Sequence, residues 1–109
     1  MATGVSMESN ALRHIVMIKV ADKENIVKML QKLEILGEGI PGVQWNTFTV
    51  NTDIGLIETN YDMVLTIDFP DKKNFFEYQT HPVHVALVEA STPLIASFSV
   101  IEFYLAPKQ

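Results

Sequence analysis

The 109-residue sequence contains no cysteine. This absence excludes disulfide bonds, thiolate catalysis and zinc sites built on cysteine, and it fits a cytoplasmic protein. Basic residues are also few, because 8 Lys and Arg stand against 13 Asp and Glu and the net charge is −5. Nucleic acids and anionic membrane surfaces bind basic faces, so we expect neither as a partner. No run approaches the roughly 18 apolar residues that cross a bilayer.

The remaining composition is that of one folded domain. Hydrophobic residues make up 48% of the chain, enough to fill a single core. Residues 1–10 are polar and small and lack the apolar stretch of a secretory signal, so we expect a disordered N-terminal lead there. We place the domain at residues 11–105 and a short C-terminal tail at residues 106–109.

Four segments are rich in β-branched and aromatic residues, which predicts strands. They are Leu12–Val20, Val43–Val50, Tyr61–Phe69 and Ser97–Leu105. The polar stretch Asn51–Asn60 predicts a loop, although its apolar residues Ile54–Ile57 are compatible with packing or pairing.

A helix is predicted between the first two strands. Asp22 is a candidate N-cap, and Ile26, Leu30 and Leu33 follow at helical spacing. Gly37 is expected to end this helix. The apolar stripe is interpreted as core.

A second helical region is predicted after the third strand, starting at Pro70-Asp71. Pro82 has no N–H and disfavours the α conformation at His81, so we expect a break there. Pro82 suits the first turn of a new helix, which Pro93 limits at its end.

The element order is therefore β-α-β-β-α-β, which is the α+β ferredoxin-like arrangement of an antiparallel sheet with helices on one face. The first and last strands are apolar on both sides. In the first strand Val16 and Ile18 oppose Ile15 and Met17, and in the last strand Phe98 and Val100 oppose Ile101 and Phe103. The helices cover one face only, so the other would expose a large apolar patch. This predicts a C2 homodimer with the two sheets packed together as a dimeric α/β barrel. The alternative is an antiparallel edge that carries a few exposed apolar residues.

The chemistry is concentrated in the segment His81-Pro82-Val83-His84, three residues after Tyr78. Histidine exchanges protons near neutral pH, so these groups in apolar surroundings indicate a pocket. The third histidine, His14, lies in the apolar first strand. For all of them the alternative is a structural role: a buried aromatic, packed histidines, or a cap at His81. His81 and His84 would supply only two metal ligands and match no known metal motif, so we expect no metal and no cofactor.

Three segments carry a resemblance to a known family. They are Arg13–Val16 with its early histidine, Val43–Trp45 with its tryptophan, and the histidine-proline segment Tyr78–Val85. Over about residues 12–105 the chain resembles the stress-responsive A/B barrel (Dabb) family, whose members are dimeric α+β barrels of plants and microbes.

The resemblance implies a function through a catalytic member, the plant olivetolic acid cyclase, which closes a linear polyketide by aldol condensation without a cofactor. By this resemblance His84 is the base and Tyr78 the hydrogen-bond donor. Three family positions differ: a third-strand histidine corresponds to Met63, a helix tyrosine to Leu30, and a glycine after the tryptophan to Asn46. The residues expected to contact a small apolar carbonyl substrate are His14, Leu30, Met63, Leu65 and His81.

Two other interpretations stay open. In one, a stress-related module uses the pocket for binding without chemistry. In the other, assembly itself is the function. Retention of Tyr78 and His84 favours an enzyme, whereas the loss of the histidine at Met63 favours binding or assembly.

Overall fold

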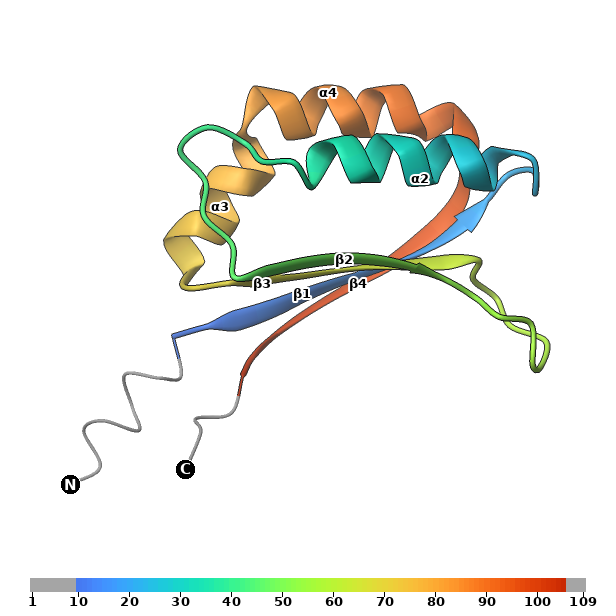
Figure 1. The fold of residues 1–109 in the computed structure, drawn as a ribbon, viewed down its shortest axis with the longest axis horizontal. Helices are drawn as coiled ribbons and strands as arrows, with labels where there is room; N and C mark the ends of the chain where they lie inside the picture. Colours follow the sequence, from blue (N-terminus) through green and yellow to red (C-terminus); the bar gives the residue numbers. More distant parts are fainter. Residues whose placement is uncertain (1–9, 106–109) are drawn as a thin grey trace.

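The computed structural model describes residues 10–105. The expected tail, and all but the last residue of the expected lead, lie outside these residues. The elements in chain order are β1 (Leu12–Val20), α2 (Asn25–Leu36), β2 (Thr47–Thr52), β3 (Met63–Phe69), α3 (Lys72–Thr80), α4 (Pro82–Ser91), a short 3₁₀ turn (Thr92–Leu94) and β4 (Ile95–Tyr104). Figure 1 shows them as a sheet with the helices stacked above it.

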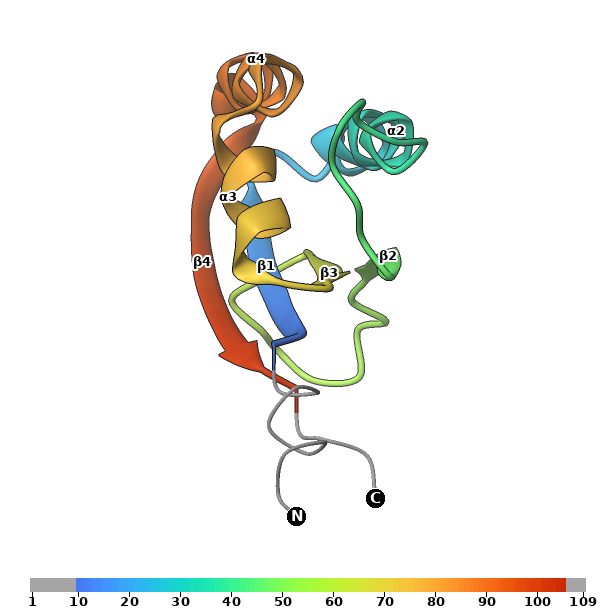
Figure 2. The ribbon, with the colours of Figure 1, turned by 90° about the vertical axis from the view of Figure 1, so that its left-hand side faces the viewer.

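The sheet is antiparallel throughout, with strand order β2-β3-β1-β4. Figures 1 and 2 show α2, α3 and α4 on one face of this sheet, while no helix of residues 10–105 covers the other face. The predicted ferredoxin-like α+β fold is confirmed, with the second helical region divided into α3 and α4.

The core lies between the helices and the covered face of the sheet. α2 contributes Met29, Leu33 and Leu36, which are almost fully buried. From the sheet come Ile67 and Phe69, both with no exposed surface. The predicted stripe faces the core: Leu33 is buried, and Ile26 and Leu30 are partly buried against it. The most deeply buried residue of the helix, Met29, was not part of the predicted stripe.

The first helix begins later than its predicted cap. Asp22 accepts a hydrogen bond from the Glu24 N–H at 3.1 Å, which forms a turn before the helix. Glu24 occupies the N-cap position and makes no side-chain cap. The prediction of Asp22 as N-cap was therefore wrong. The predicted end at Gly37 is confirmed.

The second strand also begins later than predicted, at Thr47 instead of Val43. The preceding residues find partners outside a strand ladder: the Gln44 N–H donates to Asn74 Oδ1 at 2.8 Å, and the Asn46 N–H donates to the Asp68 carbonyl at 2.6 Å. Trp45 meanwhile packs against the core. The apolar residues before Thr47 therefore belong to a segment that packs against the core and precedes the strand.

The loop after β2, residues 53–62, carries exposed apolar residues. Ile54, Leu56 and Ile57 project from the domain and do not pack or pair within it. Figure 1 shows this loop, in light green, passing beyond the edge of the sheet toward the uncovered face.

The break between α3 and α4 falls at His81, as the sequence predicts. Asp71 caps α3 by accepting the Asn74 N–H at 2.9 Å. The backbone of His81 is extended, and its Nδ1 accepts the Val83 N–H at 3.1 Å, so His81 is the N-cap of α4. The turn brings the start of α4 back over the end of α3.

The uncovered face of the sheet is apolar at its centre. Ile15 pairs with Ile101 across β1 and β4, and Met17 and Phe103 lie on either side. Ile101 is 55% exposed, and Met17 and Phe103 are also exposed. This is the patch that the sequence predicts.

Candidate functional site

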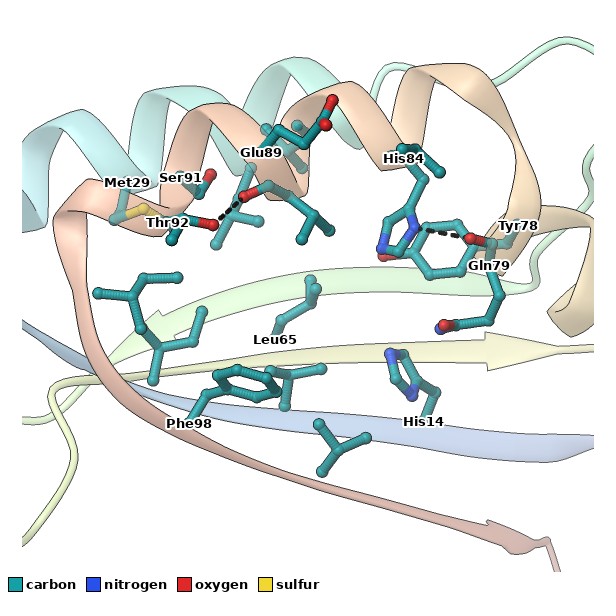
Figure 3. Close-up of a pocket in the computed structure, with 18 of the residues that line it drawn as sticks. His14, Met29, Leu65, Tyr78, Gln79, His84, Glu89, Ser91, Thr92 and Phe98 are labelled. Atoms are coloured by element: carbon teal, nitrogen blue, oxygen red, sulfur yellow. Dashed lines mark hydrogen bonds between the residues drawn. The ribbon is translucent and has the colours of Figure 1, made fainter.

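A cavity of about 590 Å³ lies between the helices and the covered face of the sheet. Its volume is within the range of small-molecule sites. Most of its wall is apolar, with contributions from Val16, Leu33, Leu65, Leu87, Ile95 and Phe98. Figure 3 shows the cavity with α4 above it and the strands, which carry Leu65 and Phe98, below it.

The polar groups gather at one end of this cavity. Figure 3 shows His84 and Tyr78 on the helix side and His14 on the sheet side, facing one another. The rings of Tyr78 and His84 lie against each other, with centroids 4.3 Å apart and planes inclined by 42°. The centroids of His14 and Tyr78 are 5.9 Å apart. The structure thus brings together three of the residues that the sequence singled out.

Tyr78 is held rigidly among aromatic rings. It is 1% exposed and packs against Phe69 at 5.3 Å and Trp45 at 6.4 Å between centroids. Burial raises the pKa of Tyr78, and no hydrogen bond within the described residues contributes to that shift. The phenol is therefore protonated at neutral pH and can donate a hydrogen bond.

His84 is the third residue of α4, and its Nδ1 lies 3.2 Å from the Gln79 carbonyl oxygen. A carbonyl can only accept, so Nδ1 carries the hydrogen and Nε2 keeps a free lone pair. Burial lowers the pKa of His84; the hydrogen bond to Gln79 opposes this and His14 adds to it. His84 is thus neutral at pH 7, the form a general base requires.

His14 projects into the cavity from β1 and is 3% exposed. Its Nδ1 lies 2.8 Å from Glu102 Oε2 on β4. Burial lowers the pKa of His14, and the hydrogen bond and charge of Glu102 oppose that shift. Sequence reasoning missed Glu102, and the only available signal was that antiparallel first and last strands could place it opposite His14.

Four other residues were expected to contact a substrate, and only Leu65 among them lines the cavity. Met63 is buried in the hydrophobic core, and Leu30 is half-buried against that core. His81 is used as the cap of α4. Leu30, Met63 and His81 therefore do not line this cavity, which is bounded by α4 and β4 more than by α2.

The entrance to the cavity lies between α4 and β4. Phe98 and Val100 on β4 line the cavity yet are well exposed. Val85 and Val88 on α4 also line the cavity and are well exposed. An apolar ligand would pass these side chains before meeting the histidines.

The two cavity histidines predict a pH dependence of stability. Since both pKa values are lowered in the folded state, the unfolded chain takes up protons first as the pH falls below about 6.5. The free energy of unfolding should therefore be constant above that pH and decrease through the window that runs from about pH 6.5 down to the lowered pKa values of the folded state. Carboxylates titrate near pH 4 and add their effect only below this window. Urea unfolding at a series of pH values measures the slope, and a stability that is flat through the window would contradict the burial of both imidazoles.

In residues 10–105, no group of three His, Asp or Glu side chains is placed to hold a metal ion. Nor does any helix in that part of the chain have the length and apolar character needed to cross a membrane.

Solved structures share this fold. A dimeric ferredoxin-like protein of unknown function from Thermobifida fusca is 26% identical, with 87% of this chain and 91% of that chain covered and a TM-score of 0.74. A Dabb family protein from Mesorhizobium loti is 21% identical, with coverages of 91% and 98% and a TM-score of 0.70. A hydroxynitrile lyase from Passiflora edulis is 14% identical, with coverages of 93% and 98% and a TM-score of 0.75. The last two show a common fold only.

A comparison with curated proteins finds no match. The family model of the stress responsive A/B barrel domain matches residues 12–105, which is nearly the whole chain. The chain therefore belongs to the stress-responsive A/B barrel (Dabb) domain family.

Proposed function

We propose that the chain is a cofactor-independent enzyme that makes or breaks carbon–carbon bonds in a small, mostly apolar carbonyl compound, in the manner of a polyketide cyclase or lyase. The observation that carries the proposal is the contact between Tyr78 and His84 at the polar end of a cavity of about 590 Å³. One residue supplies a donor and the other a base, and the rest of the wall is apolar.

The proposed reaction is an aldol step. His84 Nε2 takes a proton from the carbon next to a carbonyl, and the Tyr78 hydroxyl donates a hydrogen bond to the oxygen of the resulting enolate. The enolate carbon attacks a second carbonyl, and the new alkoxide takes the proton back from His84. The reverse sequence cleaves a β-hydroxy carbonyl compound. No net proton is gained or lost.

Two further observations support this chemistry. The start of a helix carries a partial positive charge, and His84 in the first turn of α4 is thereby disfavoured as a cation. The fold is also that of a protein named as a hydroxynitrile lyase. Fold alone does not assign a reaction, so the proposal rests on the site.

The proposal is tested with the aldol adduct of benzaldehyde and acetone, whose cleavage releases benzaldehyde and is followed by ultraviolet absorbance. We expect protein-dependent release that is unchanged after dialysis against a chelator, because the proposed residues need no metal. Loss of the activity on chelation would contradict the mechanism. If neither this adduct nor linear polyketide analogues react, the enzyme proposal fails.

A second candidate function is a non-catalytic, stress-related module that binds ligands or acts through assembly as a stable homodimer. The observation in its favour is the exposed apolar patch of Met17, Ile101 and Phe103. A dimer is proposed under either function, as is a cytoplasmic location, which the cysteine-free sequence supports. Binding of carbonyl compounds without turnover would favour this second function.

A further inference from the structure

The carboxylate of Glu102 contacts His14, the histidine on the sheet side of the cavity. Residues 14 and 102 are direct partners in the antiparallel pairing of β1 and β4, so both side chains leave the sheet on the same face. His14 Nδ1 and Glu102 Oε2 are 2.8 Å apart, and both residues line the cavity. The side chain of Glu102 is 37% exposed, whereas that of His14 is 3% exposed.

This contact fixes the form of the imidazole. A carboxylate accepts the hydrogen of Nδ1, so neutral His14 keeps its lone pair on Nε2, on the opposite side of the ring. The rings of Phe75 and Tyr78, with centroids at 5.4 and 5.9 Å, pack against the imidazole edge-on and limit its rotation. Figure 3 shows the ring rising from the sheet into the cavity, toward His84 on the opposite wall.

Three polar groups with fixed hydrogen-bonding roles therefore meet at this end of the cavity. Tyr78 is a donor and suits a carbonyl oxygen. His84 has a free lone pair and suits the acidic C–H beside that carbonyl. His14 Nε2 also has a free lone pair. The ligand group that suits this acceptor is a hydroxyl, which donates its O–H hydrogen. The other titratable side chain on the cavity wall is Glu89 from α4, and no Lys or Arg of the described residues lines the cavity.

We propose that Glu102 is a positioning residue that holds His14 Nε2 as a hydrogen-bond acceptor, and that the site therefore selects carbonyl compounds that also carry a hydroxyl group. The proposal rests on the proposed function, since it names the substrate class of the same cavity. A site that accepts a hydroxyl hydrogen bond binds the analogue without that hydroxyl less well, because its own acceptor is then left unpaired.

The first experiment needs no ligand. Nitrogen NMR of the histidines in the full chain reports which ring nitrogen of His14 carries the hydrogen. We expect the hydrogen on Nδ1 in the wild type and in Glu102→Gln, whose amide oxygen can still accept, and a mixture of tautomers in Glu102→Ala. The pKa of His14 should fall further in both variants, because each removes the carboxylate charge that raises it. A predominant Nε2–H form in the wild type would overturn the positioning role.

The second experiment measures selectivity with a matched pair of probes, acetophenone and its hydroxymethyl counterpart phenacyl alcohol, which differ by one hydroxyl. We expect the wild type to bind phenacyl alcohol about tenfold more tightly, the difference that one good hydrogen bond makes. Glu102→Ala should lose most of this preference and Glu102→Gln should retain part of it. Glu34→Gln is the control, since it neutralises an exposed carboxylate on α2 that does not line the cavity, and it should keep the full preference.

The outcomes separate the two proposals. If both ketones bind the wild type equally, the hydroxyl selectivity is wrong while the carbonyl site of the proposed function survives. If neither ketone binds, the proposed function fails and this inference fails with it. If the preference is the same in Glu102→Ala as in the wild type, His14 does not depend on Glu102.

Discussion

His84→Ala is expected to lower kcat/KM for cleavage of the benzaldehyde–acetone adduct by about 10²- to 10⁴-fold, the usual contribution of a general base. His84 Nε2 has the free lone pair that takes the proton in the proposed reaction, since its Nδ1 is engaged by the Gln79 carbonyl. Steady-state rates of benzaldehyde release measure the effect. Because His84 is only half-buried at the start of α4, the variant should fold, and circular dichroism checks this.

Tyr78→Phe tests the partner of His84 in the same assay. It removes one oxygen from a residue that is otherwise held by aromatic packing, so the ring cluster should persist. Loss of one preorganised donor to an enolate is expected to lower kcat by about 10²-fold, with little change in KM, because the hydrogen bond strengthens as charge develops on the oxygen.

Two matched variants control for nonspecific effects. His81→Asn changes the neighbouring histidine but keeps a residue able to cap α4, and Tyr104→Phe removes the hydroxyl of an exposed tyrosine. Both should retain wild-type rates. Equal activity in His84→Ala and the wild type would remove the base from the mechanism and leave binding as the better account of the cavity.

The pairing of Tyr78 with His84 was accessible from the sequence because both lie within one short segment. The proline at position 82 sets the turn, and the turn places the first residues of α4 over the last residues of α3. Local chain geometry therefore decides that part of the site. The contact of His14 with Glu102 is different, since it joins residues 88 apart and depends on the register of two strands.

The distinction between local chain geometry and long-range packing also explains where the sequence predictions and the structure differ. The strand and helix patterns that reflect local periodicity were found, including the whole of β1 and the break at His81. Residues around Trp45 have a strand-like composition, but their backbone groups bond to Asn74 and to the end of β3, which only the folded arrangement reveals. Likewise, Leu30 and Met63 are apolar in any case, and whether they face core or cavity depends on how α2 and α4 pack above the sheet.

Ile101→Glu is expected to abolish the proposed homodimer. Ile101 lies at the centre of the uncovered sheet face, next to Ile15 across the strand pair, and a C2 axis would bring two copies of the substitution into one interface. Burial of two carboxylates without partners costs several kcal/mol, so the dimer dissociation constant should rise by about a thousandfold or more. Analytical ultracentrifugation over a range of concentrations measures this shift.

The choice of position makes the experiment specific to assembly. Ile101 is 55% exposed in the single chain, so the isolated fold does not depend on its burial, and the monomer should keep its circular dichroism spectrum. Ile35→Glu is the matched control, because Ile35 is 65% exposed on α2, on the helical side of the sheet, and should leave the dimer intact. If the wild-type chain is monomeric at all concentrations, the apolar face stays exposed to solvent and does not drive assembly. If Ile101→Glu remains dimeric, the copies associate through another surface, and the sheet-to-sheet barrel is wrong for this chain.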